Sequence, residues 1–154
     1  MIYLKNILFS IFVSFEFLFI LLSYITFVFY SQPFIWVSDL FINNNLLSFS
    51  NSLPFTFLLI GLKLSYDIII PSHAYKYLFI KWEGHNHIKA TVFIGLLYII
   101  LSLIITSFLS YANLAFKPQL IGYLLILSYA LAIISFTSLY LASINVQIVL
   151  GKNT

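Results

Sequence analysis

The sequence predicts an all-α fold: a polytopic membrane protein built as a bundle of four transmembrane helices. Two observations predict this class. Hydrophobic residues make up 62% of the 154 residues and charged residues only 7%, against roughly 25% charged in soluble domains. Four apolar segments are each long enough to cross about 30 Å of hydrocarbon at about 1.5 Å per residue. The rest is too short for a soluble domain, so residues 1–154 are predicted to form a single membrane domain.

The ends of these segments carry helix-boundary signals. Pro54 and Pro118 fall where a helix is expected to begin, and Gly151 falls where one is expected to end. Proline is favoured in the first helical turn and glycine just after the last one. The predicted spans are about 7–30, 54–71, 90–112 and 119–150.

The distribution of lysine predicts the orientation. All seven basic residues are lysines, and short loops that are rich in lysine stay on the cytoplasmic side of a membrane. Four spans place five of the lysines outside the membrane on one side and Lys117 on the other, so both termini are predicted to be cytoplasmic. The five lysines are Lys5, Lys76, Lys81, Lys89 and Lys152.

Three ionisable residues fall inside the predicted spans: Glu16, Lys63 and Asp67. An unpaired charge at the bilayer centre costs at least about 2.5–3.5 kcal/mol, so such residues are expected to compensate one another. Glu16 and Lys63 lie at a similar predicted depth, and Asp67 is one helical turn from Lys63. We therefore expect an interior charge cluster. It could act as a proton relay or charge switch, or it could only tether two helices.

Small residues recur at steps of three and four in the third and fourth spans. Such residues let helices approach closely where lipid gives no hydrophobic drive for association. We interpret them as helix packing positions, within the chain or between subunits, with a serine-lined pore as the alternative. The positions are Gly95, Ser128, Ala132, Ser135, Ser138 and Ala142.

The segment 72–89 and the end of the fourth span predict a cytoplasmic surface for a protein partner. The segment mixes aromatic residues, lysines and histidines, which suits the headgroup level of a membrane. The fourth span is longer than the hydrocarbon layer requires, so its end is expected to tilt or emerge. The predicted interface residues are Tyr75, Lys76, Lys81, Trp82, His85, His87, Asn145 and Gln147.

Several classes of site are disfavoured. The chain contains no cysteine, which removes disulfides and thiolate nucleophiles. It has neither a serine nucleophile motif nor a glycine-rich phosphate loop, so we expect no enzyme activity and no cofactor. His85 and His87 without a third ligand are weak for a metal, although pH sensing is an alternative. The basic residues form no patch suited to nucleic acid.

Three functional classes remain. The chain could be a non-catalytic sensor or anchor subunit that assembles with itself and signals to a cytoplasmic protein. It could be a small proton-coupled exporter, since four helices with a glutamate in the first resemble the small multidrug-resistance family, in which Glu16 would be the proton and substrate carboxylate. The long loops, the lysine bias and Lys63 depart from that family. It could also be an oligomeric pore-forming effector.

The outer segment "SQPFIWVSDLFINNNLLSFSNSLP" and the inner segment "YKYLFIKWEGHNHIK", with four spans and cytoplasmic ends, resemble the membrane subunit of the Kiwa anti-phage defence system. The resemblance is one of architecture and covers most of the chain. It implies a homo-oligomeric sensor of phage attachment in the bacterial inner membrane, with a cytoplasmic DNA-binding partner. No family motif aligns, so the resemblance assigns no functional residue.

Overall fold

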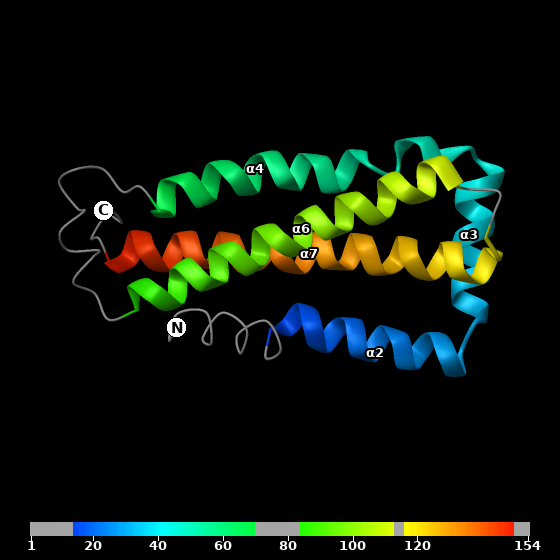
Figure 1. Ribbon diagram of the computed structural model, residues 1–154, viewed down its shortest axis with the longest axis horizontal. Helices are drawn as coiled ribbons and strands as arrows, with labels where there is room; N and C mark the ends of the chain where they lie inside the picture. Colours follow the sequence, from blue (N-terminus) through cyan, green and yellow to red (C-terminus); the bar gives the residue numbers. More distant parts are fainter. Residues whose placement is uncertain (1–13, 70–83, 113–115, 150–154) are drawn as a thin grey trace.

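The computed structural model describes residues 14–69, 84–112 and 116–149. Within these ranges the chain is helical and contains no strand, which confirms the predicted all-α class. The helix at residues 32–43 lies across one end of the molecule, whereas the longer helices run along its long direction (Figure 1). The elements are α2 (Phe15–Phe29), α3 (Gln32–Asn43), the short 3-10 helix η1 (Leu46–Phe49), α4 (Ser52–Ile69), α6 (His85–Ala112) and α7 (Pro118–Val149).

Three helical stretches in the described ranges are long and apolar enough to cross a membrane: Leu46–Ile69, His85–Tyr111 and Pro118–Ile148. A fourth is possible only if α2 and α3 together form one broken span, because these two helices meet at 97°. The structure is therefore compatible with a membrane protein of three or four spans.

The described surface is rich in large apolar side chains. Large apolar side chains are exposed on every helix, including Phe29 at 77%, Phe55 at 51% and Ile104 at 58%. Small hydroxyl side chains such as Ser102, Thr106 and Ser128 are instead fully buried. A lipid-facing exterior around an interior of small residues is the arrangement expected of helices that pack inside a bilayer.

Helix α7 is the central element, because it packs against α2, α3, α4 and α6. Its partnership with α6 is the most extensive, and there the Ser102 hydroxyl donates a 2.6 Å hydrogen bond to the Ser128 carbonyl. Leu139 of α7 is fully buried and lies against two glycines. A β-carbon added at Gly61 of α4 would lie 3.2 Å from Leu139 Cδ1. One added at Gly95 of α6 would lie 2.9 Å from Leu139 Cγ.

Two predicted boundaries are corrected. Residues 31–53 fall between two predicted spans, but most of them form α3 and η1. Helix α6 begins at His85, five residues before the predicted start of the third span. In α3 the physical reason is local, since Pro33 suits a first turn and apolar residues at 34, 37 and 41 share the face that packs into the core.

The corner between α2 and α3 is fixed by aromatic packing on α7. Tyr123 of α7 contacts Phe27 of α2, with ring centroids 4.6 Å apart, and Phe34 of α3, with centroids 5.7 Å apart. Phe27 and Phe34 also pack edge to face at 5.6 Å. Contacts of this kind stabilise by about 0.5–1.5 kcal/mol beyond the area that they bury. The three rings therefore hold α3 across the end of the bundle.

Candidate functional site

Glu16 is the one buried carboxylate among the described residues, with 4% of its surface exposed. It lies in the first turn of α2, which begins after Ser14, whose hydroxyl accepts a 3.2 Å hydrogen bond from the Phe17 amide. The Ser138 hydroxyl of α7 donates to Glu16 Oε1 at 3.3 Å, which is long for this type of bond. The helix N-terminus carries partial positive charge, so a carboxylate is well placed there.

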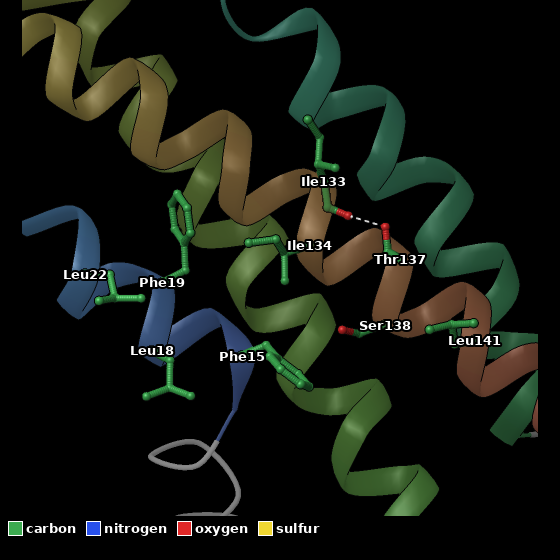
Figure 2. A pocket seen from close by; sticks show the side chains of 9 residues that line it. All are labelled: Phe15, Leu18, Phe19, Leu22, Ile133, Ile134, Thr137, Ser138 and Leu141. Atoms are coloured by element: carbon green, nitrogen blue, oxygen red, sulfur yellow. Dashed lines mark hydrogen bonds between the residues drawn. The ribbon is translucent and has the colours of Figure 1, made fainter. Parts of the chain in front are cut away.

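An open groove of about 510 Å³ lies between α2 and α7 beside Glu16. Its walls are almost entirely apolar, with two hydroxyl residues on the α7 side. Figure 2 shows Phe15, Phe19 and Ile134 between the two helices, and the Thr137 hydroxyl turned back to donate to the Ile133 carbonyl of its own helix, at 2.8 Å. The lining residues are Phe15, Leu18, Phe19, Leu22, Ile133, Ile134, Thr137, Ser138 and Leu141.

The structure does not form the expected cluster of Glu16, Lys63 and Asp67. Lys63 and Asp67 are both exposed on α4. Helix α4 packs on α6 and α7, whereas α2 packs on α7, and the two helices lie on opposite sides of the central pair (Figure 1). Within the described residues Lys63 and Asp67 make no ion pair, even with each other. Among the described residues Glu16 is instead hydrogen-bonded to Ser138, and the expected interior cluster is wrong for the two α4 residues.

The structure places the predicted small residues mainly in the interior. Gly95 meets Leu139 and lies close to the Ser135 carbonyl, while Ser128 accepts the hydrogen bond from α6. The Ser135 hydroxyl is buried without a hydrogen-bond partner among the described residues. Ser138 differs from the others, because it lines the groove and binds Glu16. Of the six positions Gly95, Ser128, Ala132, Ser135 and Ala142 are buried, and Ser138 is half-buried.

The predicted cytoplasmic interface is described in part. His85 and His87 lie in the first turn of α6 rather than in a loop. Asn145 and Gln147 are exposed near the end of α7, and the core contacts of Ile88 with that end of α7 bring both pairs to the same end of the bundle. No group of three potential metal ligands occurs among the described residues. Tyr75, Lys76, Lys81 and Trp82 lie outside the described residues.

Sequence reasoning missed Gly122, whose position decides how α3 docks. A β-carbon at 122 would overlap the Phe34 carbonyl oxygen and lie 2.6 Å from its carbonyl carbon. The signal was available in principle, since a glycine inside a helix usually has a packing reason. The groove beside Glu16 could not be found in this way, because lipid-facing and interior positions are equally apolar in this sequence.

Comparisons with protein-family models, curated proteins and solved structures give no match to the chain. The resemblances to the Kiwa membrane subunit and to the small multidrug-resistance family thus gain no support from relatives.

Proposed function

We propose that the protein is a multi-pass membrane protein that binds a lipophilic cation at Glu16 and exchanges it for a proton, as a small exporter would. One observation carries this proposal. Among the described residues a buried carboxylate has a single long hydrogen bond, and the donor of that bond, Ser138, lines an open apolar groove.

Among the described residues Glu16 has no fixed positive partner, which favours an exchangeable one. A buried charge that is not paired is costly, and it is neutralised either by a proton or by a cation that enters the site. Lys63 cannot be the positive partner of Glu16, because it is exposed on α4, which packs on α6 and α7 and not on α2. Within the described part of the chain Glu16 is therefore left without a fixed counter-charge, which a bound cation would supply.

The groove suits an apolar cation better than a metal ion. Ligand pockets are typically about 300–1,000 Å³ in volume and largely apolar, with few polar groups, and the α2–α7 groove fits that description. Phe15 and Phe19 contribute aromatic rings to the walls (Figure 2), and ring faces attract cations. Hard metal ions prefer several oxygen ligands, which the described lining does not provide.

We also propose the finer topology, with four spans and both termini in the cytoplasm, on the basis of the lysine distribution. Glu16 then lies in the cytoplasmic half of the bundle, because its partner Ser138 is eleven residues, or about 16 Å, from the end of α7. A cation would enter the groove from the inner leaflet.

Equilibrium binding of tetraphenylphosphonium to the purified protein in mild detergent tests the site. The wild-type protein is expected to bind this probe, and Glu16→Gln is expected to weaken binding at least tenfold. Asp67→Asn is the matched control, because it removes a carboxylate on α4 outside the groove and should leave binding within twofold. Equal binding by the Glu16→Gln variant, or no saturable binding by the wild type, would show that Glu16 is not a cation site.

A second candidate function is the non-catalytic sensor or anchor subunit with a cytoplasmic partner. One observation favours it: α6 and α7 contain 28 and 32 residues, hence about 42 and 48 Å, more than the hydrocarbon layer of about 30 Å. Their shared end exposes His87, Asn145 and Gln147. The anti-phage role, the inner-membrane location in a bacterium and the DNA-binding partner remain proposals that rest on architectural resemblance.

A photo-crosslinking residue at Gln147 tests this alternative in cells. The sensor proposal expects one defined adduct with a soluble protein, and none from the same residue at exposed, lipid-facing Tyr140. Adducts of equal yield at both positions, or none at either, would contradict a docking surface at this end of α7.

A further inference from the structure

Helix α4 exposes a line of polar side chains on its outer face. Ser52, Thr56, Lys63 and Asp67 are all exposed, and their separations of four, seven and four residues place them on one side of a helix. The hydroxyls of Ser52 and Thr56 already donate to the Phe49 and Ser52 carbonyls. The two charged residues have no such partner within the described part of the chain.

The position of this face makes the exposure costly. Leu46–Ile69 is apolar enough to span a membrane, and Lys63 and Asp67 lie six and two residues from its end. A charge that faces lipid there must be paired or must reach the interface. In the apolar 18-residue stretch of this span 22% is buried inside the molecule, compared with 44% and 50% in the corresponding stretches of α6 and α7. Of the three candidate spans in the described ranges, α4 is thus the least covered and the one with exposed charges.

We propose that a second copy of this chain covers the outer face of α4, with α4 packed against α4 about a two-fold axis normal to the membrane. In a two-fold interface, if residue i of one copy contacts residue j of the other, then residue j of the first copy also contacts residue i of the second. Lys63 of each copy can then reach Asp67 of the other, one turn along the helix. A face with one positive and one negative group a turn apart is complementary to itself in this symmetry.

The rest of the face fits such a contact. Ser52 and Thr56 are small, which lets two helices approach closely, and their hydroxyl hydrogen bonds within the chain leave no donor unsatisfied in the interface. Leu59, 54% exposed, lies between the hydroxyl and charged residues and supplies apolar contact. The charge pairs would set the register of one α4 helix against the other, and the small residues would set the distance between the two helix axes.

Cysteine crosslinking in native membranes tests this interface, because the chain has no cysteine of its own. Leu59→Cys is expected to form a disulfide-linked dimer on mild oxidation. Ile100→Cys is the matched control, because Ile100 is exposed on α6 and its neighbour Ile99 lies against Gly61 of α4, close to Leu59 along the bundle, and it should crosslink at least fivefold less. Equal yields at the two positions, or a product whose mass is not twice that of the chain, would overturn the proposal.

Charge reversal in the Leu59→Cys background tests the pairing itself. Lys63→Asp or Asp67→Lys alone places like charges opposite one another and should lower the crosslinked fraction at least fivefold, whereas the two together restore complementarity and should return it to within twofold. If a single reversal fails to reach the membrane, Lys63→Met with Asp67→Leu gives an apolar face that inserts and should still lower crosslinking. Crosslinking that is unaffected by removing both charges would refute the reciprocal pairs.

Discussion

The backbone of Phe34 lies against Gly122 so closely that a β-carbon at position 122 would overlap the Phe34 carbonyl. This contact docks α3 on α7. We predict that Gly122→Ala displaces α3 and destabilises the protein by about 1–3 kcal/mol, the usual cost of overpacking. Thermal unfolding of the detergent-purified protein would measure it.

Gly61→Ala is the control for that substitution. At Gly61 the nearest neighbour of an added β-carbon is the flexible Leu139 side chain at 3.2 Å, not backbone. Gly61→Ala should therefore destabilise the protein less than Gly122→Ala does. A loss of stability in Gly61→Ala as large as that in Gly122→Ala would contradict the close backbone approach of α3 to α7.

The Ser102–Ser128 hydrogen bond joins α6 to α7 at 2.6 Å in the buried interior. Interhelical bonds of this kind contribute about 0.6 kcal/mol on average in a membrane protein. We predict that Ser102→Ala lowers the free energy of unfolding by about that amount, measured by denaturant titration in detergent. Ser48→Ala removes an exposed hydroxyl that bonds locally and should have no effect. Equal values for the two variants would argue against this bond.

Phe57 of α4 stacks on Phe136 of α7, with ring centroids 4.6 Å apart and planes inclined by 10°. A double-mutant cycle with leucine at both positions should show a coupling free energy of about 0.5–1.5 kcal/mol. Phe57→Leu combined with Phe108→Leu should be additive, because Phe108 packs on Phe116 instead. Additivity in the Phe57–Phe136 cycle would mean that the stack adds nothing beyond burial.

The proposed orientation predicts which end of the bundle faces out. Ser48 lies exposed at the α3 end and Gln147 at the opposite end of α7. In whole cells an impermeant thiol reagent should label Ser48→Cys directly and Gln147→Cys only after permeabilisation. The reverse pattern would invert the orientation that the lysine distribution predicts.

The parts of the fold that sequence predicts well are those marked by proline and by unbroken apolar runs. The predicted span 119–150 matches α7 (Pro118–Val149), and 54–71 matches the core of α4 (Ser52–Ile69). Helix α3 escaped prediction because Asn43, Asn44 and neighbouring serines made the whole outer segment look like a loop.

The candidate site was predictable only in part. Glu16 was identified correctly as buried, since a carboxylate inside an apolar span must be accommodated. The partner of Glu16 was not predicted, because whether Lys63 or Ser138 lies beside it depends on which helices are neighbours. In a membrane helix both the lipid-facing and the interior side are apolar, so hydrophobic periodicity cannot show which way Lys63 points.

The central place of α7 has a consequence for biosynthesis. Every helix that α7 touches precedes it in the sequence, so the ribosome delivers α2, α3, α4 and α6 before the element that gathers them. Helices α4 and α6 can pack on one another before then, but the contacts that α7 makes with all four helices form only after the segment beyond Pro118 has been translated. A nascent chain arrested before that point would expose Glu16 without Ser138, and is expected to be a substrate for membrane quality-control proteases.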